Sequence, residues 1–232
     1  MLKIEKTEVY GWEAAIRGMR NPMNSWEKSD SFACSLDECA GSLCGYDING
    51  ICPITDDLKF VIGPSDYELM MKLRKAGTDH RKFMRMIVVS FDVTAPLYWW
   101  KEYDTYKVGT VANSCSTMHK IHAKEFTLDD FSHEHLVNPC EHLQPIVDTL
   151  NYYRAYFNNP NEQDFHKTAW WQMIQLLPSS YNQKRTVMLN YEVLANMYKS
   201  RKNHKLDEWH TFCDWIEELP YSELITGGEG NE

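Results

Sequence analysis

The sequence predicts an α+β fold, because one clear strand pattern accompanies a largely helical C-terminal half. Along Met86–Val93, apolar residues alternate with polar ones, so Ile87, Val89 and Phe91 fall on one face of a half-buried strand. Farther along, helical patterns predict helices over about 137–157, 162–176, 180–202 and 206–218. A length of 232 residues suits one large domain, and we predict a single domain over 1–225.

The residues around this strand carry signals for helix ends. Ser65 is followed three residues later by a glutamate, which is a capping-box pattern, and Gly77 suits the C-terminal end of that helix. Pro96 is expected to end the strand, and a helix is predicted over 97–104. A further helix-start signal lies at Thr127–Asp130.

The first 60 residues show little regular pattern apart from a predicted helix over Trp12–Met19. Residues 21–64 are rich in Asn, Ser, Asp, Gly and Pro, and we predict an irregular insertion there. The glycine-rich end, 226–232, is predicted to be a flexible tail.

The net charge and the hydropathy of the chain limit the kinds of partner that we expect it to bind. A net charge of −9 disfavours binding to duplex DNA or RNA, although a small phosphorylated ligand needs only a few local cations. No apolar run approaches the length of a membrane span, and the first residues carry no hydrophobic signal region. We therefore expect a cytoplasmic protein with no membrane partner.

Cysteine and histidine groups raise the question of a metal site. The seven cysteines are odd in number, which argues against a disulfide framework. No C-x2-C pair occurs among the clustered cysteines, so we favour reduced thiols over metal binding and predict no metal. The histidine groups lack the H-E-x-x-H pattern, and hydrogen-bonded or solvated side chains are the favoured interpretation. The residues concerned are Cys34, Cys39, Cys44 and Cys52, and His119 with His122 and His133 with His135.

Two stretches have an order and spacing that resemble a known family. The first, 69–107, runs from a helix through Gly77 and a turn to a strand ending in Ala95-Pro96, and then to an aromatic helix. The second follows Leu177-Pro178 and includes Asn190, Leu194, Asn196 and Arg201. Together they cover about a third of the chain and resemble the flavin-dependent thymidylate synthases.

The resemblance implies an antiparallel sheet with flanking helices and a homotetramer with a pyrimidine nucleotide as its partner. It implies methylation of the uracil C5 of dUMP, or of a related pyrimidine nucleotide, with methylenetetrahydrofolate, reduced FAD and NADPH. It also suggests cofactor-binding residues and substrate-binding residues, while no catalytic residue can be assigned. The cofactor set is Arg85, Lys107, Thr110 and Asn190, and the substrate set is Lys107, Ser116, Lys184 and Arg201.

The sequence departs from the family at the signature R-H-R-x-x-S, which falls on 105–110. Thr105 and Tyr106 replace the first arginine and the histidine, and Lys107 keeps the charge of the second arginine without its fork of donors. Glu192 stands at the position of another family arginine. Two alternatives therefore stay open: a relative with a changed reaction or nucleotide, and a non-enzymatic nucleotide-binding or regulatory protein.

Some of these residues also have simpler interpretations. In a helix over 180–202, Asn190 and Arg201 would share a face, yet Arg201 would also suit the negative end of the helix dipole. The aromatic cluster of Tyr98, Trp99, Trp100 and Tyr103 could stack on a flavin, but aromatic residues at helical spacing more often belong to a core.

Overall fold

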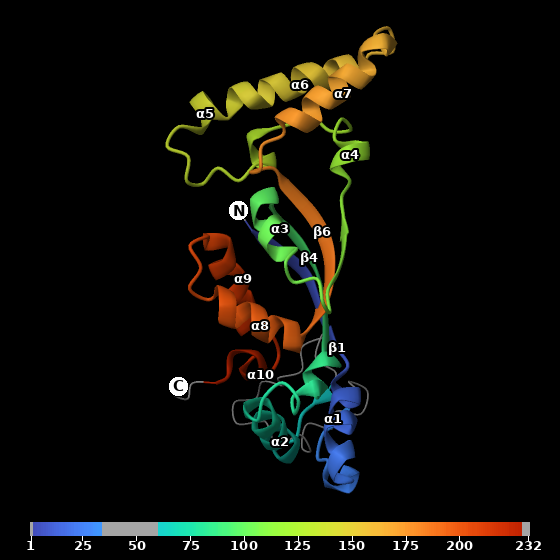
Figure 1. Cartoon of the computed structure of the whole chain (residues 1–232), viewed down its shortest axis with the longest axis vertical. Coiled ribbons are helices and arrows are strands. Elements are labelled where there is room, and N and C mark those ends of the chain that lie inside the picture. The colour runs from blue at the N-terminus through green and yellow to red at the C-terminus, as the bar shows by residue number, and fades with distance from the viewer. Residues whose placement is uncertain (1, 34–59, 229–232) are drawn as a thin grey trace, which may run out of the picture. The chain divides into compact units, whose positions relative to one another are not determined.

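The computed structural model describes residues 2–33 and 60–228. Its main sheet has four antiparallel strands in the order β1-β4-β6-β5, and a two-stranded sheet pairs β2 with β3. The predicted α+β class is confirmed (Figure 1). Most of the predicted insertion, and with it Cys34, Cys39, Cys44 and Cys52, lies outside the described residues. The strands are β1 (Lys3–Tyr10), β2 (Phe32–Ala33), β3 (Phe60–Val61), β4 (Val88–Pro96), β5 (Val111–Ser114) and β6 (Asn182–Asn190).

Strand β4 has the predicted alternation. Val89, Phe91 and Val93 are buried on one face, and the residues between them are partly exposed. Pro96 is the last residue of the strand and the N-cap of α3 (Leu97–Tyr103), so the predicted change from strand to helix is confirmed. Burial of every second residue fixes the register of this strand, because a shift by one residue would expose its apolar face.

The helix predicted over 180–202 is wrong in its first half. Residues 182–190 form β6, and only Tyr191–Arg201 is helical, as α8. Long-range hydrogen bonds hold the strand: the Trp100 indole donates to the Gln183 carbonyl, and the Cys115 amide donates to the Lys184 carbonyl. These partners outweigh the local helix propensity of Gln, Lys, Arg and Met.

Two compact units are distinguished, and each is described by itself. Unit 1 comprises Met1–Glu5, Asp92–Lys107 and Ala112–Val187. Its helices α6 and α7 lie side by side (Figure 1) and cover an apolar cluster. That cluster contains Ile121, Phe126, Phe131, Leu143, Val147, Leu150 and Met173. Besides α3, the helices of this unit are α4 (Thr117–Lys120), η5 (Leu128–Asp130), α5 (Pro139–His142), α6 (Gln144–Asn158), η6 (Gln163–Phe165) and α7 (His166–Leu176).

Unit 2 comprises Lys6–Phe91, Val108–Val111 and Met188–Glu232. Its first helix follows Gly11, which has a φ of 91° and a hypothetical Cβ only 2.0 Å from the Met86 carbonyl oxygen. Only glycine fits this turn, because both its backbone angle and its close contact exclude a side chain. The helices of this unit are α1 (Trp12–Arg20), η1 (Asn21–Met23), η2 (Trp26–Lys28), α2 (Pro64–Lys75), η4 (Lys82–Arg85), α8 (Tyr191–Arg201), α9 (Asp207–Glu217) and α10 (Glu223–Thr226).

The predicted start of α2 needs a correction. Pro64 is its first residue, so Ser65 is not the N-cap, and no capping box forms there. The Asp30 carboxylate takes that role from another segment by accepting hydrogen bonds from the Ser65 and Asp66 amides. The predicted end is confirmed, because the helix stops just before Gly77, whose φ is 106°.

The other helical predictions are mostly confirmed. Helices α1, α6, α7 and α9 fall within the predicted ranges or within a residue or so of them, and Thr127 with Asp130 forms a capping box at η5. The tail prediction was too long, because Thr226 belongs to α10, and residues after Gly228 lie outside the described residues. No helix in the described ranges is both long enough and apolar enough to span a bilayer.

Candidate functional site

The N-terminal turn of α8, in unit 2, brings several of the predicted residues together. Asn190 is the N-cap, and its side-chain oxygen accepts a hydrogen bond from the Val193 amide at 3.1 Å. A side-chain oxygen at this place satisfies one of the free N–H groups of the helix. Asn190 therefore begins α8, with Glu192 in its first turn, and does not lie inside a longer helix.

The loop Val108–Thr110 lies against this helix end. Gly109 has a φ of 81°, and a Cβ on it would stand 3.0 Å from Val193 Cγ2 and 3.3 Å from Asn190 Nδ2. The loop can approach α8 this closely because Gly109 has no side chain. Gly109, in the second half of the segment on which the signature was placed, therefore lies next to Asn190.

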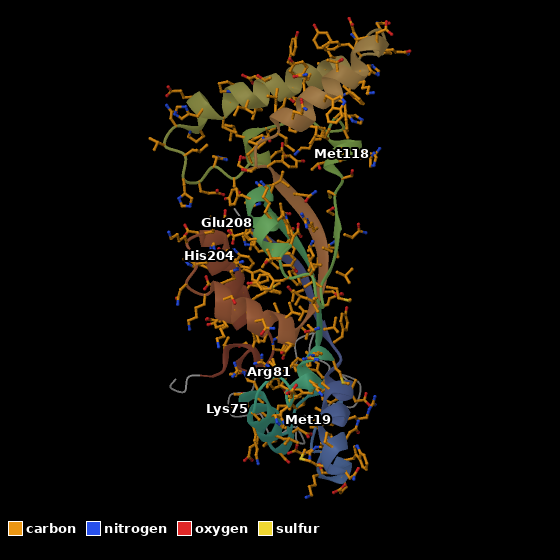
Figure 2. The ribbon with its side chains drawn as sticks, in the orientation of Figure 1. Met19, Lys75, Arg81, Met118, His204 and Glu208 are labelled. Carbon is orange, nitrogen blue, oxygen red and sulfur yellow. The ribbon has the colours of Figure 1, made fainter. Side chains whose placement is uncertain are left out.

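Arg81 supplies a cation to the same place, and sequence reasoning missed it. Arg81 is labelled in Figure 2. Its Nε lies 2.9 Å from Glu192 Oε2, and its Nη2 donates to Asn196 Oδ1 at 3.4 Å. Both atoms of the 2.9 Å contact are buried, but their geometry is that of a charge contact and not of an aligned hydrogen bond. We call the group of Arg81, Gly109, Asn190, Glu192 and Asn196 the α8 site.

No local sequence signal identifies Arg81. Glu192 is buried, and a buried carboxylate requires a nearby cation, but this burial is visible only in the structure. The choice among Arg81, Lys82 and Arg85 could not be made, since it depends on how η4 packs against α8. Arg85, predicted to bind the cofactor, is exposed at the end of η4.

Within unit 1, contacts of Asp104 and Thr105 fix the start of the segment that leads to Lys107. Arg185 Nη1 lies 2.7 Å from Asp104 Oδ1, and the guanidinium stacks over Trp100 at 4.1 Å from the ring centre. Thr105 donates its hydroxyl to the Glu102 carbonyl. Lys107 itself is exposed, so its ammonium group is open to solvent and to a ligand.

Lys184, predicted to bind the substrate, lies in a cluster of charges on the main sheet. Its Nζ is 3.0 Å from Asp92 Oδ2 and 3.8 Å from Glu5 Oε2. The hydrogen bond with Asp92 and the charges of both carboxylates raise the pKa of Lys184. Thr186 also donates its hydroxyl to Asp92. These carboxylates would compete with a ligand phosphate for the lysine.

The remaining predicted residues lie elsewhere. Arg201 is in the last turn of α8, where its charge suits the helix dipole, and its guanidinium lies 4.8 Å from the centre of the Trp209 ring. Asn190 is the N-cap of α8 and precedes the helix, and Leu194 and Met197, which were expected to share a face with Asn190 and Arg201, are fully buried. Ser116 caps α4 by accepting a hydrogen bond from the His119 amide.

The aromatic cluster belongs to the core. Trp99, Trp100 and Tyr103 are at most 2% exposed and pack edge-on or tilted against one another. Burial raises the pKa of the Tyr103 hydroxyl far above its usual range. The simpler interpretation as packing residues is therefore the one that the structure supports, while Tyr98 is partly exposed.

A pocket of about 570 Å³ between α8 and α9 offers no activated nucleophile. It is lined by Tyr198 and Cys213 among other polar residues. Burial raises the pKa of the Cys213 thiol to about 11 and, with the hydrogen bond to Glu217, that of Tyr198 to about 12. Both groups are protonated at neutral pH, and a protonated thiol is a poor nucleophile.

His133 and His122 each make a separate contact. His133 Nδ1 lies 2.8 Å from the Phe131 carbonyl oxygen, and the His122 ring packs on Phe157. Burial lowers the pKa of His122. In residues 2–33 and 60–228, no group of three or more His, Cys, Asp or Glu side chains is arranged to hold a metal ion.

Comparisons with known proteins identify the fold. No protein-family model matches the sequence, and no curated protein matches it significantly. Among the solved structures with a similar fold are two crystal structures of a flavin-dependent thymidylate synthase from Helicobacter pylori in complex with FAD and dUMP. Each has a TM-score of 0.64 and 15% sequence identity, and each match covers 97% of this chain and 98% of that chain. The chain therefore has the fold of a flavin-dependent thymidylate synthase.

Proposed function

We propose that this protein is a flavin-dependent thymidylate synthase-like enzyme, which methylates the uracil C5 of dUMP or of a related pyrimidine nucleotide. The observation that carries the proposal is the similarity of fold over 97% of the chain to an enzyme crystallised with FAD and dUMP. Folds host several functions, so the site has to support the reaction independently.

The α8 site has features that fit the diphosphate of FAD. A helix N-terminus carries a partial positive charge, and Arg81 adds a full charge beside it, which Glu192 partly offsets. Arg85, in the last turn of η4, is proposed as a further cation for the cofactor. Gly109 lets the loop pack directly against Val193 and Asn190 at this helix end. The Asn190 side-chain oxygen is used by the cap, so this residue would offer a ligand its amide nitrogen. We assign cofactor binding to this site, with Thr110 and the adjoining Lys107.

The proposed reaction needs no nucleophile from the protein. When bound, FAD supplies the hydride, methylenetetrahydrofolate supplies the carbon, and NADPH supplies the electrons. The chain has to bind anionic groups and hold the uracil in place. Within unit 1, Lys107, with Ser116 and Lys184, is proposed to bind the nucleotide, and the charge-assisted hydrogen bonds of Lys107 would carry most of the phosphate affinity. Arg201, in unit 2, is proposed for nucleotide binding on the resemblance alone.

A second candidate function is nucleotide binding without turnover. Three observations favour it: Thr105 and Tyr106 carry no charge, Asp92 and Glu5 surround Lys184, and Glu192 lies against Arg81. Each reduces the positive potential that a phosphate or a developing negative charge would meet. A protein of this kind would bind a nucleotide and form no thymidylate.

A turnover assay separates the two candidates. Purified protein is supplied with FAD, NADPH, methylenetetrahydrofolate and dUMP, and dTMP is measured by chromatography. The enzyme proposal predicts dTMP that depends on both FAD and the folate. Tight binding of dUMP with no dTMP would support the second candidate.

Lys107→Ala tests the placement of the signature. We expect its affinity for FAD or dUMP to fall by about tenfold, the loss typical of a charge-assisted contact. Lys101→Ala is the matched control, because Lys101 is an exposed lysine six residues earlier on α3. If both affinities are unchanged by Lys107→Ala, the signature has been placed on the wrong residues.

We also propose a homotetramer. Val108 and Val111 are 91% and 60% exposed, and apolar side chains this exposed suit a contact with another subunit. Light scattering combined with size-exclusion chromatography would give the mass directly. A monomeric mass at micromolar concentration would rule out the tetramer.

A further inference from the structure

A second polar pocket lies in unit 2, apart from the α8 site. Its volume is about 310 Å³, at the lower end of the range for small-molecule sites. It is lined by the last residue of α1, by the following turns and by the first three turns of α2. The lining residues are Arg20, Met23, Ser25, Lys28, Ser65, Glu68, Leu69 and Lys72.

Arg20 is the buried cation of this pocket. It is 3% exposed, and its Nε donates to Asp66 Oδ1 at 2.6 Å. Asp66 is fully buried and also accepts hydrogen bonds from Ser29, Asp30 and Ser31. So many contacts fix the carboxylate, and the carboxylate in turn fixes the guanidinium. Arg20 is therefore oriented before any ligand arrives.

The outer edge of this guanidinium is only loosely bound. Its Nη1 donates to the Ser25 carbonyl and hydroxyl at 3.3 and 3.4 Å, and its Nη2 donates to the Ser65 hydroxyl at 3.2 Å. These distances exceed the usual length of a charge-assisted hydrogen bond. Both hydroxyls line the pocket and can turn to donate to a bound anion.

The charges around the pocket favour an anion. Lys28 and Lys72 line it, and neither forms an ion pair with another residue of the described ranges. Asp66 balances Arg20, so Glu68 is the one lining carboxylate that opposes the two lysines. Asp30 occupies the amides at the start of α2, so the anion would be held by side chains and not by the helix end.

We propose that this pocket binds a phosphate group, either as free phosphate or as part of a small phosphorylated molecule. A tetrahedral dianion can accept from an oriented guanidinium edge, two hydroxyls and two ammonium groups at once. The proposal does not depend on flavin chemistry, because none of these residues belongs to the α8 site. It assigns a ligand to residues for which the flavin-dependent reaction gives no role.

Calorimetric titration of the full chain with inorganic phosphate tests the proposal. Ionic strength is held constant with sodium chloride, so that screening does not change. We expect saturable binding, weakened by about tenfold or more when Lys28→Ala and Lys72→Ala are combined. The control is Lys75→Ala, which should leave the affinity within about twofold. Lys75, labelled in Figure 2, belongs to the same helix as Lys72 and is not among the residues that line the pocket.

Two further titrations identify the source of the phosphate and the site of binding. Uridine monophosphate is titrated into Lys107→Ala, in which the proposed nucleotide site is weakened. Binding that is at least about tenfold tighter than that of phosphate, and that is lost when Lys28→Ala and Lys72→Ala are added, would indicate a phosphorylated small molecule, and equal affinity would indicate the free ion. Arg81→Met alters the α8 site and should leave phosphate binding unchanged. No saturable binding of phosphate by the wild-type chain, or equal binding by the double lysine variant, would overturn the proposal.

Discussion

The ion pair Arg20–Asp66 and the charge cluster around Lys184 use similar groups in opposite surroundings. The side chains of Arg20 and Asp66 are 4% and 0% exposed, whereas those of Lys184 and Asp92 are 41% and 13% exposed. A buried pair that loses one partner leaves an uncompensated charge, while an exposed pair is largely replaced by water. The first pair should therefore be essential for folding, and the second should be open to change at little cost.

The Arg81–Glu192 pair is intermediate between these two. Its side chains are 16% and 8% exposed, and it joins the segment before η4 to the first turn of α8. If burial determines the energetic importance of each pair, the three should rank in order of exposure. Four predictions test that order.

The largest expected effect is that of Asp66→Asn. The change leaves the buried Arg20 without its counter-charge, and we expect a loss of about 3–5 kcal/mol in the free energy of unfolding. Urea denaturation followed by tryptophan fluorescence measures it. Glu13→Gln, which breaks the exposed pair with Arg17, is the control and should cost no more than about 0.5 kcal/mol. A loss below about 1 kcal/mol for Asp66→Asn would contradict the ranking.

Lowering the pH should reproduce part of the loss of stability expected for Asp66→Asn. Burial acts to raise the pKa of Asp66, but hydrogen bonds from Ser31, Ser29 and Arg20 outweigh burial and hold it below 3.8. A depressed pKa contributes stability that is present above the unfolded value and is lost as the pH falls through the folded value. Unfolding free energies measured between pH 6 and 2 should therefore fall more steeply below about pH 3.8 in the wild type than in Asp66→Asn. If the unfolding free energies of the wild type and of Asp66→Asn change with pH in parallel, protonation of Asp66 does not cause the loss of stability in acid.

Glu192→Gln should have an intermediate effect. It leaves Arg81 partly buried without its carboxylate, and we expect a loss of about 1–3 kcal/mol. A double-mutant cycle with Arg81→Met separates the pair from its surroundings. A coupling energy near zero would mean that the 2.9 Å contact contributes nothing to stability.

The smallest effect is expected for Lys184→Met. The lysine is exposed, so the loss of its contacts with Asp92 and Glu5 should change the unfolding free energy by no more than about 1 kcal/mol. Thermal unfolding in low and high salt measures the change. A loss as large as that of Asp66→Asn would show that exposure does not determine the order.

Local patterns explain which elements the sequence could predict. Strand β4 and helices α6, α7 and α9 carry complete periodic patterns in their own residues. Strands β1 and β6 do not, because β1 is mostly polar or half-exposed and β6 contains good helix formers. Their partners lie far away in the sequence, so pairing decides what local propensity does not.

In the candidate site too, local features could be predicted from the sequence and long-range contacts could not. Asn190 followed by Glu192 is a recognisable helix start, and this local pattern indicates where α8 begins. Arg81 lies more than a hundred residues earlier, and nothing in its own neighbourhood indicates that it meets Glu192. Arg20 and Asp66 likewise meet only through the packing of α1 and α2.

The most direct test of the proposed function is the visible absorption spectrum of the purified protein, recorded alone, with FAD, and with FAD and dUMP. We expect a flavin band that stays with the protein and shifts when dUMP is added, because both ligands would occupy adjoining sites. A protein that neither retains nor takes up flavin would contradict the proposed enzyme and leave the fold without its flavin chemistry.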